Sequence, residues 1–181
     1  MDKLNQITHF LVNTATYFFI LLIVLRFLLQ LVRADFYNPL SQFIAKATNP
    51  LVIPLRKVVP SVFGVDMASL VLMIALQMIA LQLLAFIQYD TTIPAANLVI
   101  LSFYRLIALI LDIYFFSFII LVVISWVAPR TQNPAISILY SLTEPVLQPI
   151  RRVIPAMGGL DFSIMIAMLL IIVIKILLGI S

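Results

Sequence analysis

The chain has 181 residues, of which 64% are hydrophobic and only 10% are charged, and its net charge is +4. Soluble domains are about 45–50% apolar and about 25% charged, and a chain this small cannot bury so much apolar surface in a water-soluble fold. The composition therefore predicts a membrane protein. Because the sequence has no cysteine and a single histidine, His9, it excludes disulfides, thiolate metal sites and histidine metal clusters.

The first apolar stretch, residues 10–32, is long enough to cross the hydrocarbon core, which takes about 20 helical residues. It lacks the basic start and the small-residue cleavage site of a removable signal peptide. We therefore expect a retained first transmembrane helix. Arg26 lies seven residues from its inner end, about 10 Å along a helix, so its side chain can extend to the membrane interface.

Residues 33–66 form the first predicted loop. Asn38 followed by Pro39 is typical of a helix N-terminus. The apolar residues that follow recur at helical spacing and share one face: Leu40, Phe43, Ile44 and Ala47. The segment is too short and too polar to cross a membrane, so we expect an amphipathic helix in the interface.

The end of this loop is rich in residues that interrupt or begin helices. We expect Pro50 and Pro54 to break or bend the interfacial helix, and Pro60 and Gly64 to turn the chain back towards the bilayer. Asp66 is expected to cap the following helix, because a carboxylate is favoured at a helix N-terminus.

The next two apolar stretches predict a second span over about 67–88 and a third over about 97–128. Gln77 interrupts the second, whereas Arg105 and Asp112 lie within the third. The third stretch is longer than a perpendicular span needs, so it is tilted or begins in the interface.

The second predicted loop covers residues 129–161, and the fourth span covers about 162–180 and contains Lys175. Asn133 and Pro134 again form a helix start, followed by apolar residues at helical spacing. We expect a second amphipathic interfacial helix here.

The two loops match without a gap when 95 is added to the residue numbers of the first. The counterparts of Arg56 and Lys57 are then Arg151 and Arg152. The other matching residues of the second loop are Pro145, Pro149, Pro155, Gly159 and Asp161. This register predicts an internal duplication, with one repeat in residues 1–88 and another in residues 89–181.

Two spans return each repeat to its starting side, so the repeats have the same orientation, related by a pseudo-two-fold axis along the membrane normal. Basic residues concentrate in the two loops, which positive-inside asymmetry assigns to the cytoplasm, with both termini on the opposite side. The predicted fold class is an all-α membrane protein with four transmembrane helices.

The basic pairs of the loops have two interpretations that the sequence leaves open. In the simpler interpretation, Arg56, Lys57, Arg151 and Arg152 only set the topology and anchor the loops to the membrane. Each positive charge near an anionic leaflet contributes about 1 kcal/mol to such anchoring. In the other, the loops form a cytoplasmic docking surface for a protein partner or a specific lipid.

Charges inside a bilayer usually face protein or a cavity. Counted from the cytoplasmic side, Asp112 and Lys175 reach similar depths, so we predict that they pair, with Arg105 as a competing partner seven residues from Asp112. A channel would use Asp112 and Gln77 in a polar pathway. An inter-helix tie is favoured, because the repeat-related position of Asp112 is Tyr17, which is not an acid.

Enzyme motifs are missing from the sequence, which has no paired carboxylate motif, nucleophile elbow, phosphate-binding glycine loop or zinc-ligand spacing. We therefore expect no catalytic residues, no cofactor and no metal site.

The duplicated pattern resembles the YggT family of small bacterial inner-membrane proteins, which has relatives in chloroplasts. The resemblance covers essentially the whole chain. It is carried by Asp35-Phe36-Tyr37-Asn38-Pro39, the prolines and basic pair within residues 49–60, Pro145 to Pro155, and Gly158-Gly159-Leu160-Asp161-Phe162-Ser163. Residues 61–66 follow the pattern more loosely than their counterparts in the second loop.

The resemblance implies a multi-pass protein of the bacterial inner membrane, with no catalytic residues to carry over. Family members have been linked to osmotic or ionic stress tolerance, cell division and, in plastids, cytochrome complex assembly. Our first hypothesis is a non-enzymatic protein that organises or helps assemble other membrane components through its basic loops. The alternative is a small ion-transport or transport-accessory protein in osmotic or potassium stress. Expected partners are anionic lipids and a membrane protein or a second copy; nothing indicates nucleic acid.

Overall fold

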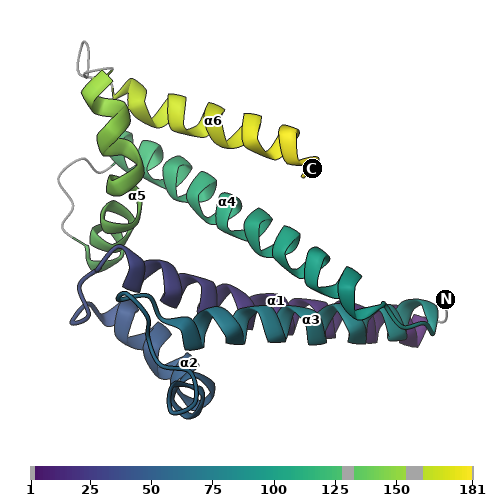
Figure 1. Ribbon diagram of the computed structural model, residues 1–181. Coiled ribbons are helices and arrows are strands. Elements are labelled where there is room, and N and C mark those ends of the chain that lie inside the picture. Colours follow the sequence, from purple (N-terminus) through teal and green to yellow (C-terminus); the bar gives the residue numbers. More distant parts are fainter. Residues whose placement is uncertain (1–2, 128–132, 154–160, 181) are drawn as a thin grey trace. The chain divides into compact units, whose positions relative to one another are not determined.

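The computed structural model describes residues 3–127, 133–153 and 161–180, and its regular structure in these ranges is helical. An isolated antiparallel bridge joins Val62 and Val65. The helices, shown in Figure 1, are α1 (Lys3–Leu31), α2 (Pro39–Arg56), α3 (Met67–Tyr89), α4 (Ala95–Val127), α5 (Pro134–Val153) and α6 (Phe162–Leu178).

Three of these helices are long and apolar enough to cross a membrane: α1 with 29 residues, α3 with 23 and α4 with 33. The bounds of α3 and α4 agree with the predicted second and third spans within two residues. The apolar helix α6 is shorter, at 17 residues, or about 26 Å. The structure is thus all-helical, as predicted.

Helix α1 starts earlier than the apolar stretch that predicted it, at Lys3 instead of residue 10. Residues 3–9 contain no glycine or proline, and the Thr8 hydroxyl donates to the carbonyl oxygen of Leu4 at 2.9 Å, one turn earlier. The polar start therefore continues the helix instead of forming a separate tail.

The prolines do not break the two loop helices. Helix α2 continues through Pro50 and Pro54, and α5 continues through Pro145 and Pro149. Each proline lacks an N–H and so removes one hydrogen bond. Since the two prolines of each helix are four residues apart, the lost bonds lie on one side, and the other sides remain bonded.

The buried face of α2 differs from the apolar face predicted. Ile44 is buried as expected, but Phe43 is 57% exposed, and Thr48 and Val52 have no exposed surface. The threonine is accommodated because its hydroxyl donates to the carbonyl oxygen of Ile44 at 2.7 Å. The small polar residue therefore packs inward with its hydrogen-bonding capacity satisfied.

The chain reverses between α2 and α3. Val62 and Val65 exchange backbone hydrogen bonds of 3.2 and 2.9 Å, and Phe63 and Gly64 between them have positive φ angles of 51° and 80°. Glycine adopts this conformation without steric cost, which explains its place in the predicted turn. The corresponding Pro155 and Gly159 lie outside the described residues.

Contacts divide the chain into two compact units, which we describe separately. Unit 1 comprises Met1–Gln30 and Phe43–Ile107, and unit 2 comprises Leu31–Gln42 and Ala108–Ser181. In unit 1, α1 and α3 lie side by side and α2 lies across one end of them (Figure 1). In unit 2, the core is formed by α4, α5 and α6 around Phe118, Leu121, Leu147, Ile164, Ala167 and Ile171.

Several residues that are 95 apart in the sequence are buried in both units. Four such pairs have no exposed surface: Ile23 and Phe118, Thr48 and Thr143, Val52 and Leu147, and Ala68 and Ser163. Both threonine hydroxyls also donate to the carbonyl oxygen four residues earlier, at 2.7 Å.

Candidate functional site

In unit 1, an arginine at the end of α2 is bound to the aspartate that begins α3. Arg56 donates through Nε to Oδ1 of Asp66 at 3.3 Å and through Nη2 to Oδ2 at 2.5 Å. The same carboxylate accepts from the backbone N–H of Ser69 at 3.3 Å and from its hydroxyl at 2.6 Å. Asp66 therefore closes the loop and caps α3, as its position predicted.

Unit 2 contains the same arrangement 95 residues later. Arg151 in α5 donates through Nε to Oδ2 of Asp161 at 2.9 Å. Asp161 caps α6 by accepting from the backbone N–H of Ser163 at 3.0 Å. Arg151 has an additional partner, because its Nη1 donates to Oε2 of Glu144 at 2.7 Å. We call each arginine–aspartate contact a loop tie.

Both loop-tie aspartates remain ionised at neutral pH. Burial alone would raise the pKa of Asp66, whose side chain has no exposed surface, but hydrogen bonds from Arg56 and Ser69 outweigh it and lower the pKa. Burial also opposes ionisation of Asp161, and hydrogen bonds from Arg151 and Ser163 again lower the pKa. Each loop tie therefore joins two oppositely charged groups at neutral pH.

The loop ties divide each predicted basic pair into two different residues. Arg56 and Arg151 are bound within the chain. Lys57 and Arg152 are exposed, and neither forms an ion pair with a described residue. Sequence reasoning could not distinguish the members of a pair, although the fixed spacing of ten residues between arginine and aspartate was a signal for the contact.

Arg26 contacts α2. Its Nη1 donates to Thr48 Oγ1 at 2.7 Å, to Asn49 Oδ1 at 2.8 Å and to the carbonyl oxygen of Ala45 at 3.3 Å. These acceptors are all uncharged. The sequence predicted only that Arg26 reaches the interface, and it missed the polar side chains of α2 as partners.

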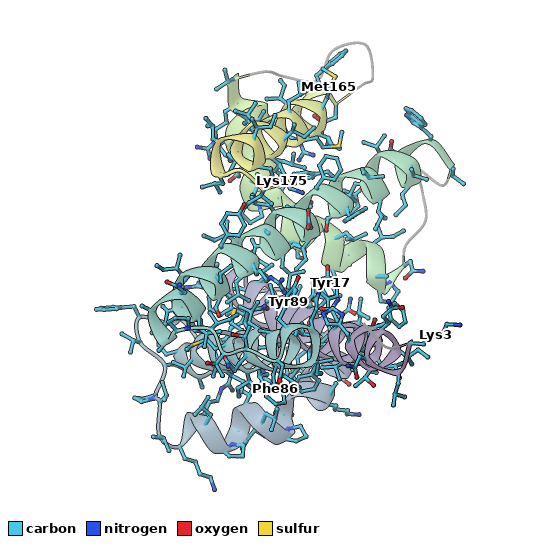
Figure 2. The ribbon with its side chains drawn as sticks, turned by 90° about the vertical axis from the view of Figure 1, so that its right-hand side faces the viewer. Lys3, Tyr17, Phe86, Tyr89, Met165 and Lys175 are labelled. Atoms are coloured by element: carbon cyan, nitrogen blue, oxygen red, sulfur yellow. The ribbon has the colours of Figure 1, made fainter. Side chains whose placement is uncertain are left out.

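The pair predicted from depth forms within unit 2. Lys175 in α6, which is labelled in Figure 2, donates through Nζ to Oδ1 of Asp112 in α4 at 2.8 Å. The competing candidate Arg105 forms no ion pair with any residue in the described ranges. Gln77 is buried in unit 1, with 7% of its surface exposed.

The structure also contains an open pocket in unit 2 and an apolar groove in unit 1. In unit 2, the N-terminal ends of α2 and α5 meet where Asn38 Nδ2 donates to the carbonyl oxygen of Pro134 at 2.7 Å, beside an open pocket of about 670 Å³. In unit 1, an apolar groove of about 250 Å³ lies between α1 and α3. Among the described residues, no three His, Cys, Asp or Glu side chains are grouped to hold a metal ion.

The helices and ion pairs together define a class of protein: an α-helical chain with several segments able to cross a bilayer. The family is defined by sequence. The CCB3/YggT family model matches residues 5–87 and again residues 100–181, so the chain belongs to this family.

The relatives are bacterial proteins of similar length. The chain is 42% identical over 170 residues to an uncharacterised protein of Pseudomonas aeruginosa. The aligned region covers 93% of this chain and 86% of the relative. It is 38% identical over 173 residues to the uncharacterised protein YggT of Escherichia coli K12. This alignment covers 95% of this chain and 88% of the relative. No solved structure matches the chain.

Acid should weaken the loop tie of unit 1. Because the folded-state pKa of Asp66 is lowered, its contribution to stability is present above the unfolded-state pKa, about 3.9, and is lost as pH falls through the folded-state value. We expect Asp66→Asn to lower the thermal stability of the detergent-solubilised protein at pH 7 and to flatten its decline in acid. Asp90→Asn, at an exposed aspartate, is the control; equal behaviour of the two variants would disprove this role.

Charge exchange tests the pair between α4 and α6. Asp112→Lys alone and Lys175→Asp alone each place two like charges together, which is unfavourable in an apolar segment. The double variant restores an opposite pair, so its thermal stability should exceed that of both single variants. A double variant no more stable than the worse single variant would show that the contact contributes nothing.

Proposed function

We propose that this protein is a non-enzymatic integral protein of the bacterial inner membrane that organises other membrane components or assists their assembly. It docks through two cytoplasmic loops, with Lys57 and Arg152 as the exposed contact residues. The observation that carries the proposal is the loop tie, which occurs at matching positions in both halves.

We infer that the chain crosses the membrane four times, as two repeats of the same orientation. The family model matches the chain twice, over residues 5–87 and 100–181. Helix α6, with 17 residues, lies at the lower limit of known spans, and Asp161 and Gly179 cap its two ends. The prolines, the loop ties and the buried threonines all recur at an offset of 95.

The loop tie favours docking over simple anchoring. Attraction to an anionic leaflet is worth about 1 kcal/mol for each basic residue near the surface and does not require a fixed loop geometry. The loop ties restrain the backbone beside Lys57 and Arg152, which reduces the entropy lost when a partner binds. A restrained, exposed cation beside a rigid helix end is suited to recognising a partner surface.

The transport alternative depends on Asp112. Its carboxylate is bound to the ammonium group of Lys175 at 2.8 Å, so it is not a free ligand for a passing cation. A scaffold should tolerate Asp112→Asn, which retains an acceptor for Lys175, and it should tolerate Gln77→Leu. A transporter should lose its activity with both variants.

Photocrosslinking in living cells tests the docking surface. Crosslinkers at positions 57 and 152 should each capture the same membrane protein in near-stoichiometric yield, whereas a crosslinker at the exposed Tyr89, at the other end of α3, should not. Lys57→Gln should reduce capture from position 152. Recovery of lipid adducts or copies of this chain alone would refute docking as the main role.

A further inference from the structure

We propose that the first half of the chain holds the phosphate group of one anionic phospholipid between Arg26 and Arg56, at the inner end of α1, and that the second half lacks this site. The proposal rests on the inferred membrane insertion but needs no protein partner. The lipid site and the docking surface can therefore be tested separately, and failure of one does not refute the other.

The cluster in unit 1 has more positive than negative charge. Arg26, Arg56 and Asp66 are its ionised members, which leaves one positive charge uncompensated. The carboxylate of Asp66 is occupied by Arg56 and Ser69. Arg56 Nη2 also donates at 3.3 Å to Oε1 of Gln30, which lies one turn after Arg26 on the same face of α1, so the two arginines are neighbours. An external anion between these arginines would be attracted by both.

Arg26 also has unused hydrogen-bond donors. A guanidinium carries five N–H groups, and the hydrogen bonds to Ala45, Thr48 and Asn49 all come from Nη1. Its Nε and Nη2 donate to no residue in the described part of the chain. An unpaired charge in an apolar segment is unfavourable, and an anion that accepts these hydrogen bonds would remove the penalty.

The second half shows what replaces such an anion. Leu121 and Glu144 stand at the positions that correspond to Arg26 and Asn49. The Glu144 carboxylate binds Arg151 at 2.7 Å, so Arg151 has two carboxylate partners and the cluster has a net charge of −1. Unit 1 has the neutral amide of Asn49 and the additional cation Arg26, whereas unit 2 has the carboxylate of Glu144. Arg151 thus has a second carboxylate partner, whereas the second side-chain partner of Arg56 is the neutral amide of Gln30, to whose Oε1 its Nη2 donates at 3.3 Å.

The location and the geometry of the donors indicate a lipid phosphate. Arg26 lies five residues before the end of α1, about 7.5 Å along the helix, and a long arginine side chain at such a position can extend to the headgroup layer. Guanidinium groups bind phosphate with two parallel hydrogen bonds. Arg56 is 39% exposed at its side chain, so an incoming headgroup can contact it.

Native mass spectrometry of the detergent-solubilised protein tests the site. Titration with phosphatidylglycerol should give one tightly retained lipid per chain, and phosphatidylcholine should give none of comparable affinity. Arg26→Leu and Asn49→Glu, which copy the second half, should each weaken this binding by at least about tenfold. The matched control Lys46→Gln removes an exposed cation of α2 outside the cluster and should leave the affinity unchanged.

A gain-of-binding variant protects the test against misfolding. The double variant Leu121→Arg with Glu144→Asn copies the first half into unit 2, because it removes the internal anion and adds the second arginine, and it should add a second phosphatidylglycerol site. Unchanged lipid affinity in Asn49→Glu, or no additional lipid with this double variant, would overturn the proposal. Inorganic phosphate is titrated in a separate experiment. If the protein bound inorganic phosphate as tightly as phosphatidylglycerol, the site would be one for free phosphate and the lipid assignment would be refuted.

Discussion

The loop tie is the contact on which the rest of this structure depends. Two prolines remove backbone hydrogen bonds from the last turns of α2 and again from α5, so the ends of these helices need another restraint. An arginine at that end and the aspartate that caps the next apolar helix provide it in both halves. In each half, one carboxylate therefore caps the following helix and compensates the arginine.

The two halves share this contact but differ in the polar residues around it. Arg26 and Asn49 in the first half correspond to Leu121 and Glu144 in the second. The ion pair of Asp112 and Lys175 likewise corresponds to Tyr17 and Ala80, and Ala80 lines the apolar groove between α1 and α3. The two halves thus share one contact and differ in the charged residues around it.

Much of this framework was predictable from local sequence signals. The caps at Asn38 and Asp66 and the bounds of α3 and α4 follow from residue type and apolar length. The pairing of Asp112 with Lys175 followed from counting depth along two helices. The contact of Arg26 with α2 was not predictable, because it depends on how two helices are rotated about their axes. A break, one of the two outcomes expected at Pro50 and Pro54, does not occur, because the other sides of α2 keep their hydrogen bonds.

The most direct measurement is the mobility of a spin label at Val58, an exposed position two residues beyond Arg56. Its electron paramagnetic resonance spectrum should indicate a restrained backbone in the wild-type protein in bilayers. Arg56→Gln should mobilise the label, while Arg33→Gln, which removes an exposed arginine outside the loop tie, should not. An unchanged spectrum in Arg56→Gln would contradict the conclusion that the ion pair holds the loop in place.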